Sequence, residues 1–201
     1  MQSELHHPTY KFVSEQESDA LAWVFIDKEN MKKVPIKFPP LKPTEARAKV
    51  TYAGLCHTDC LVVRDEVGSV VHPICPGHEI VGIITQVGSE VKDLKVGDKA
   101  GFGAQRDCCD ECEFCKEKDD HLCQGKLDQI GTYGDHYWGG YATHIQHPAK
   151  FFFKSFQKTF LKRKCLLFSV LVSQCMLPSP DMLNQDKKWL FLVLEDLDTL
   201  V

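Results

Sequence analysis

The chain has 201 residues, a formal net charge of −4 and 43% hydrophobic side chains, which suffices for a buried core in one large or two small domains. Its Lys and Arg residues are scattered rather than clustered, which argues against a nucleic-acid partner. The longest apolar run, residues 165–177, is interrupted by polar side chains and falls short of the ~20 residues that a membrane span needs. We therefore expect no nucleic-acid partner and no membrane partner.

The chain opens with MQSELHHPTY, a polar stretch without an apolar signal core, so we expect a cytoplasmic protein. Residues 1–20 as a whole are interpreted as a polar N-terminal lead-in. Five of the ten cysteines fall within residues 108–123. In a reducing compartment such crowding favours metal binding over disulfides.

Residues 21–154 consist mostly of short β-type segments separated by Gly, Pro and Asp. The segments are AWVFI, RAKVTYAGL, EIVGIITQVG, KVGDKAGFG and GGYATHI. Short strands at regular spacing are typical of an antiparallel barrel or sandwich, and not of alternating strands and helices. Residues 78–100 are predicted to form two strands joined by a turn, the second entered at Gly97-Asp98. The predicted class is mainly β (α+β).

Two short motifs place possible metal ligands next to predicted strands. GLCHTDC contains Cys56, His57 and Thr58, and PGHE contains His78 and Glu79. Each motif alone is weak evidence, because a Cys beside a His is more often a buried thiol next to a surface imidazole. Together, one thiolate and one imidazole at strand ends are the beginning of a catalytic zinc site that leaves a position open.

The segment CCDECEFCKEKDDHLC contains the spacing C-x2-C-x2-C-x7-C, formed by Cys109, Cys112, Cys115 and Cys123. Four thiolates on a tight loop suit tetrahedral Zn²⁺, and a shell closed by four sulfurs leaves no position for substrate. We therefore predict a structural zinc. The alternatives are a redox or disulfide cluster, and a ligand set in which Cys108 replaces Cys109.

The order and spacing of GLCHTD, PGHE, KVGDKA, the four-cysteine loop and GGYA resemble those of the zinc-dependent medium-chain alcohol dehydrogenases. The most similar branch is that of the cinnamyl-alcohol dehydrogenases, whose members reduce aldehydes with NADP(H). The resemblance covers residues 21–154 and implies a GroES-like, partly open antiparallel β-barrel with a structural zinc loop. It further implies hydride transfer between a small-molecule alcohol or aldehyde and NADP(H), and a family homodimer that is doubtful for this chain.

The resemblance also implies roles for individual residues. Cys56 and His78 would hold the catalytic zinc, and Glu79 would be an alternate ligand or a carboxylate next to the ligands. Thr58 would hydrogen-bond the substrate oxygen and pass on its proton, while His57 would lie near the cofactor.

The chain departs from the family pattern at two places. Many relatives have a proton-relay His where this chain has Leu61. The third zinc ligand of the family is a cysteine beyond the barrel, in a stretch resembling L-C-A-G that this sequence lacks. Cys165 and Cys175 lie in the right region without that context, and Cys60 and Cys75 are interpreted as ordinary buried thiols.

The composition changes abruptly at about residue 155. All 13 glycines lie at or before Gly140, and residues 156–201 contain neither Gly nor Ala. The family's Rossmann domain needs a glycine-rich turn, where the backbone approaches the cofactor pyrophosphate. We therefore expect the Rossmann domain to be missing and residues 155–201 to be a non-homologous tail.

Back-translation in a shifted frame offers an explanation for the tail. Residues 169–176 permit C-A-G-V-T-V-Y and residues 187–201 permit K-V-A-I-L-G-I-G-G-L-G-H-L-G, which resemble the two missing pieces in the right order. We interpret the tail as an out-of-frame, poorly ordered reading, with a genuine extension of the barrel as the alternative. The transcript across codons 150–160 tests this. The competing functional hypothesis is a catalytically inactive zinc-binding barrel fragment.

Overall fold

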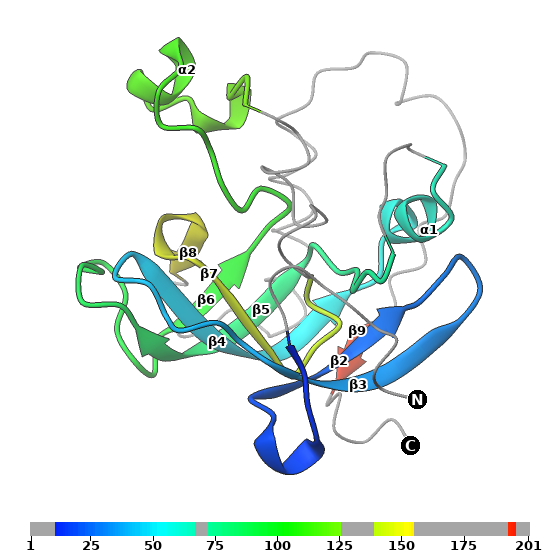
Figure 1. Cartoon of the computed structure of the whole chain (residues 1–201). Helices are drawn as coiled ribbons and strands as arrows, with labels where there is room; N and C mark the ends of the chain where they lie inside the picture. Colours follow the sequence, from blue (N-terminus) through cyan, green and yellow to red (C-terminus); the bar gives the residue numbers. More distant parts are fainter. Residues whose placement is uncertain (1–10, 67–71, 126–138, 155–192, 196–201) are drawn as a thin grey trace.

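The computed structural model describes residues 11–66, 72–125, 139–154 and 193–195. Their strands form two sheets in which all paired strands are antiparallel (Figure 1). The smaller sheet has the order β1-β3-β2, with β1 at Lys11–Phe12, β2 at Ala20–Phe25 and β3 at Met31–Lys37. The mainly β class and the antiparallel pairing were both predicted and are confirmed.

The larger sheet has six strands in the order β7-β4-β5-β6-β8, and β9 also pairs with β4. Its members are β4 (Glu45–Gly54), β5 (Ile80–Val87), β6 (Lys99–Phe102), β7 (His144–Pro148), β8 (Phe152–Lys154) and β9 (Val193–Glu195). The pairing of β4 with β5 shifts its register at Arg47/Ala48 and again at Val50/Tyr52. Such bulges bend a strand and increase its twist. The sheet therefore curls into the partly open barrel that was predicted.

One hydrophobic core joins the two sheets. Along β2, buried residues alternate with half-buried ones, which is the period of a strand with one face against a core. The same cluster contains Ile36 of β3, Val50 of β4, Ile80 of β5 and Phe102 of β6. An isolated bridge pairs Ala22 with Ala142, so the small sheet is also tied to the segment that precedes β7.

The predicted turn between β5 and β6 is present. Gly97 has φ +91°, a left-handed conformation that glycine adopts at little cost. Its N–H donates to the carbonyl of Ile84 at 2.8 Å, and Asp98 accepts a 3.0 Å hydrogen bond from the N–H of Lys95. The turn residues thus set the register of the two strands.

The helices were not predicted from the sequence. They are α1 (His57–Val63) and α2 (Glu113–Lys116), with 3-10 turns η2 (Glu15–Glu17), η3 (Asp120–Leu122) and η4 (Ala149–Phe151). α1 follows β4 directly, and α2 lies in a loop that projects from the larger sheet (Figure 1). In the described part of the chain, no helix is both long and apolar enough to cross a membrane.

The lead-in and the tail are described only in part. Residues 11–20 of the predicted lead-in contribute β1, η2 and the first residue of β2 to the small sheet. Of the predicted tail, residues 193–195 form β9, which pairs with Tyr52, Ala53 and Gly54 of β4. Residues 1–10, the rest of the tail, Cys165 and Cys175 lie outside the described residues. The out-of-frame interpretation therefore stays a prediction.

Candidate functional site

One group of possible metal ligands lies where β4 leads into α1 and where the next loop leads into β5. Cys56 is the residue before α1, and His78 and Glu79 immediately precede β5. One ligand atom from each of the three lies within 4.8 Å of the ligand atoms of the other two. The structure thus brings together the thiol, the imidazole and the carboxylate that were singled out in the sequence.

The donor set fits a zinc ion. Sulfur, nitrogen and oxygen ligands from three residues are what a catalytic zinc site uses when it keeps a fourth position open. Glu79 is 2% exposed, and among the described residues its Oε2 has no hydrogen-bond partner. A buried carboxylate oxygen without a partner is costly, and a cation would supply the missing interaction. Burial also raises the pKa of Glu79.

Asp59 connects the two loops that carry these ligands. It is buried in the first turn of α1, and its Oδ2 accepts the backbone N–H of Cys56 at 2.9 Å. Its Oδ1 accepts the N–H of Gly77 at 3.0 Å and lies 3.1 Å from Nδ1 of His78. Because an ionised carboxylate only accepts hydrogen bonds, Nδ1 carries the ring proton and Nε2 is left to bind a metal.

Without a metal, the electrostatics of the pair shift Cys56 toward the thiolate and His78 toward the protonated imidazole. A hydrogen bond with His78 lowers the pKa of Cys56. Burial lowers the pKa of His78, but hydrogen bonds with Asp59 and Cys56 outweigh burial and raise it to about 10. A metal must displace the proton on the imidazole, so binding becomes tighter as the pH rises.

The two other residues assigned from the resemblance lie on the first turn of α1, and both have exposed side chains. The hydroxyl of Thr58 lies 3.6 Å from Sγ of Cys56, so it is next to the ligand group and open to solvent. His57 is also exposed. Their roles toward substrate and cofactor stay predictions.

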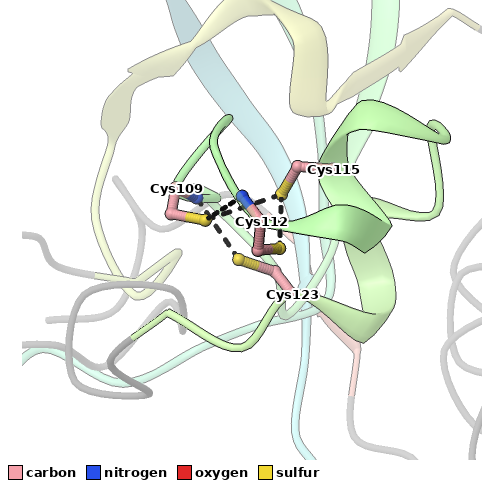
Figure 2. A group of neighbouring side chains, drawn as sticks. All are labelled: Cys109, Cys112, Cys115 and Cys123. Carbon is pink, nitrogen blue, oxygen red and sulfur yellow. Dashed lines mark hydrogen bonds between the residues drawn. The ribbon is translucent and has the colours of Figure 1, made fainter.

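The second group consists of the four cysteines of the loop around α2. Figure 2 shows their sulfur atoms gathered between the loop and the short helix. Sγ of Cys115 lies 3.5 Å from that of Cys112 and 3.9 Å from that of Cys109, and all four sulfurs lie within 4.8 Å of one another. With Zn–S bonds of about 2.3 Å, a tetrahedral ion needs sulfurs about 3.8 Å apart. The arrangement therefore fits the predicted structural zinc.

Backbone N–H groups point at the sulfurs of this cluster. Cys112 donates to Sγ of Cys109, and both Cys109 and Gly125 donate to Sγ of Cys123, each at 3.3 Å. Backbone hydrogen bonds, with those from Gln124 and Cys115 first, lower the pKa of Cys112 to about 6. Desolvation and neighbouring thiols raise the pKa of Cys115. These surroundings favour a thiolate at Cys112, whereas ionisation of Cys115 requires a cation to offset the burial and the neighbouring sulfurs.

Three further cysteines in the described part of the chain have other surroundings. Cys108 is buried, and its Sγ lies 2.9 Å from Nζ of Lys150, outside the four-sulfur group but within another possible donor set with Cys115 and Asp120. Cys75 is fully buried and donates a 3.4 Å hydrogen bond to the carbonyl of Tyr141, and burial raises its pKa. Cys60 is half-buried.

Sequence reasoning missed two residues at the first site, Asp59 and Tyr141. The hydroxyl of Tyr141 donates to Oδ2 of Asp59 at 3.1 Å and lies 3.3 Å from the carbonyl of Gly54. Burial and the charge of Asp59 raise the pKa of Tyr141, so its hydroxyl stays a donor. Both residues stand inside motifs that the sequence displayed, CHTD and GGYA, but nothing local indicated that the two motifs meet.

Comparisons with known proteins agree with this geometry. Residues 42–157 match the model of the alcohol dehydrogenase GroES-like domain. The chain is 36% identical over 144 residues to mannitol dehydrogenase of Apium graveolens, covering 71% of this chain and 36% of that protein. It is 42% identical over 100 residues to cinnamyl alcohol dehydrogenase 2 of Rauvolfia serpentina, covering 50% and 27%.

Among solved structures, the fold is similar to the crystal structure of CAD from Helicobacter pylori complexed with NADP(H). The TM-score is 0.62 and the identity 27%, over 69% of this chain and 42% of that one. The chain therefore spans less than half the length of each of these relatives.

Proposed function

The chain belongs to the alcohol dehydrogenase GroES-like domain family, whose model matches more than half of its residues, and on this premise we propose that it acts in the zinc-dependent interconversion of alcohols and aldehydes with NADP(H). The observation that carries this proposal is the convergence of Cys56, His78 and Glu79 at one site. The similarity to a mannitol dehydrogenase and a cinnamyl alcohol dehydrogenase supports the substrate class, and the similarity to a CAD structure complexed with NADP(H) supports the cofactor.

Each residue of the first site has a separate task in this proposal. Cys56, His78 and Glu79 would hold the zinc, which when bound supplies a Lewis acid that stabilises negative charge on the substrate oxygen. Cys56, His78 and Glu79 already supply three ligands, so this site does not require Cys165 or Cys175. Asp59 holds Nδ1 of His78, which leaves Nε2 as the ring nitrogen that would bind the zinc.

Thr58 would move the proton. Its hydroxyl is exposed beside Cys56, so it can donate to a substrate oxygen placed at the open position and take up a proton from it. His57, on the same exposed turn, would face the cofactor, and hydride would pass between the substrate carbon and the nicotinamide. Leu61 has no titratable group, so a relay beyond Thr58 would use solvent.

The four-cysteine group supports a second candidate, a zinc-binding barrel that does not catalyse. The four-cysteine group is complete within residues 109–123 and has no open position, so it can bind metal without any cofactor. The relatives are more than twice as long as the part that this chain matches. On this reading the barrel keeps its fold and its structural metal but does not transfer hydride.

Turnover and cofactor binding separate the two candidates. The zinc-loaded chain is incubated with NADPH and cinnamaldehyde, and NADPH oxidation and NADPH binding are both measured. The first proposal expects turnover that the Cys56→Ser substitution abolishes, while Cys60→Ser, a thiol deletion one helical turn further along the chain, retains it. A folded, zinc-loaded chain that neither binds NADPH nor oxidises it would contradict the first proposal and support the non-catalytic barrel.

A further inference from the structure

We propose that Tyr141 is a positioning residue for the metal held by Cys56, His78 and Glu79, because its hydroxyl fixes the carboxylate that aligns both ligand loops. The inference rests on the proposed function and adds to it a residue from a third segment of the chain. Tyr141 lies 82 positions from Asp59 in the sequence, just before β7.

Both oxygens of the Asp59 carboxylate face hydrogen-bond donors. Oδ1 faces the N–H of Gly77 and Nδ1 of His78, and Oδ2 faces the N–H of Cys56. These three donors all belong to the loops that carry the ligands, so they move with the ligands. The fourth is the hydroxyl of Tyr141. It is the donor among the four that comes from outside these loops and can hold the carboxylate against the scaffold.

The hydroxyl makes its stronger contact with Asp59. It carries one proton, which can go to Oδ2 of Asp59 at 3.1 Å or to the carbonyl of Gly54 at 3.3 Å. The carboxylate contact is shorter, and hydrogen bonds to an ionised acceptor are about twice as strong as neutral ones. Since Asp59 is 2% exposed and Tyr141 6% exposed, little water is available to replace this bond.

Tyr141 is itself held firmly. Gly139, Gly140 and Tyr141 donate backbone hydrogen bonds of 2.8, 2.7 and 3.0 Å to the carbonyls of residues 75, 77 and 76. The carbonyl of Tyr141 accepts the N–H of Trp23 at 2.8 Å, which ties it to β2. A Cβ on Gly139 would meet the carbonyl oxygen of Gly77 at 2.3 Å, so the close approach of the two segments requires glycine. The hydroxyl therefore has a fixed position relative to the loop of His78.

Removal of the Tyr141 hydroxyl should leave the three metal ligands in the sequence but make their positions less fixed. With phenylalanine at position 141, Oδ2 of Asp59 loses one donor and the carboxylate can rotate about its side chain. The imidazole of His78 and the N–H of Cys56 are then no longer held by a carboxylate in a fixed position. Residues that orient metal ligands typically contribute 10–100-fold to metal affinity, and for this single hydrogen bond we expect the lower end, about tenfold.

Cobalt binding tests the inference without any catalytic assay. The four-cysteine group is first filled with one equivalent of Zn²⁺, and Co²⁺ is then titrated while the thiolate-to-cobalt and d–d absorption bands are recorded. The variant is Tyr141→Phe. The matched control is Thr143→Val, which removes a hydroxyl from the same segment where it accepts the N–H of Leu21 at 3.1 Å. Melting curves and retained zinc report on the fold.

We expect Tyr141→Phe to weaken Co²⁺ binding about tenfold and to alter the d–d bands, while Thr143→Val leaves both within twofold of the wild type. In an Asp59→Asn background, Tyr141→Phe should add little, since both changes act through one carboxylate. Wild-type affinity and spectrum in Tyr141→Phe would overturn the inference, even if the melting temperature falls. If Cys56→Ser removes none of the cobalt bands seen in the wild type, no cobalt binds at Cys56, and this result would instead contradict the proposed function.

A second measurement leaves Tyr141 intact and so does not depend on the folding of a variant. In the wild-type chain labelled with ¹³C at tyrosine Cζ, filling the site with Zn²⁺ should shift the Tyr141 resonance, because Asp59 is shared between the hydroxyl and the ligand loops. A Tyr141 resonance that does not move while the site fills would contradict the inference.

Discussion

Nζ of Lys150 lies 2.7 Å from Oδ1 of Asp110, and this ion pair ties the four-cysteine loop to η4, the 3-10 turn between β7 and β8. The side chains are 39% and 72% exposed, so solvent screens the pair and its contribution is expected to stay below about 1 kcal/mol. Lys150→Met should lower the free energy of unfolding by no more than that, measured by urea denaturation. Lys116→Met, which removes an exposed charge from α2, is the control. A loss of several kcal/mol in Lys150→Met alone would contradict this estimate.

Removal of one structural ligand should have a much larger effect. Cys112→Ser leaves three thiolates around the ion, and structural zinc in small domains contributes about 10–16 kcal/mol of apparent binding energy. We expect one zinc fewer per chain and a melting temperature lower by at least about 10 °C, which corresponds to several kcal/mol. Cys108→Ser should keep the zinc, because Cys108 contacts Lys150 and lies outside the four-sulfur group. Zinc loss in Cys108→Ser instead would assign Cys108 as the ligand.

The carboxylate of Glu79 packs so closely against Gly54 that no side chain fits at position 54. A Cβ on Gly54 would lie 2.1 Å from Oε2 of Glu79, whereas a Cβ on Gly103 would meet nothing within 4 Å. Gly54→Ala should therefore displace the carboxylate, weaken metal binding at the first site and cost about 1–3 kcal/mol from overpacking. Gly103→Ala should change neither quantity. Equal metal affinity in the two variants would show that Glu79 is not a ligand.

The ion pair at the β5–β6 turn should make stability depend on pH in acid. A hydrogen bond with Lys154, at an Nζ–Oδ2 distance of 2.7 Å, holds the pKa of Asp98 below its ordinary value of 3.8. A carboxyl group with a depressed folded-state pKa stabilises the fold above its unfolded pKa, and this stabilisation is lost as the pH falls through the folded pKa.

Unfolding of the wild type and of Asp98→Asn by urea, compared from pH 7 downwards, checks this dependence. The difference in unfolding free energy should be constant above about pH 5 and should shrink below pH 3.8. Metal loss in acid affects both proteins, so the difference isolates Asp98. A difference that grows as the pH falls would contradict the assignment.

Features that depend on residues close together in the sequence could be predicted from it. The β5–β6 turn followed from Gly97-Asp98, whose glycine occupies a left-handed conformation. The four-cysteine loop followed from ligand spacing alone, since the ligands lie within a few residues of each other. The helix α1 was missed, because Cys56 is not a typical residue for a helix N-terminus, although the bond from its N–H back to Asp59 is a common start signal.

Features that depend on contacts between residues far apart in the sequence could not be predicted from it. Nothing near Asp59 indicates that its carboxylate meets Tyr141, because the contact exists only after residues 139–141 pair with residues 75–77. The strand β3 carries three consecutive exposed residues at its start, Met31, Lys32 and Lys33, which obscures the alternation expected of a strand. Its pairing with β1 and β2 stabilises it instead.

The zinc content of the folded chain tests the central claim, that Cys56, His78 and Glu79 form a metal site separate from the four-cysteine group. Native mass spectrometry of the zinc-loaded protein should show two zinc ions per chain, with one retained in Cys56→Ser and in His78→Ala and two retained in Cys60→Ser. A wild-type chain that binds a single zinc, unchanged by Cys56→Ser and lost in Cys112→Ser, would contradict the claim and leave only the structural site.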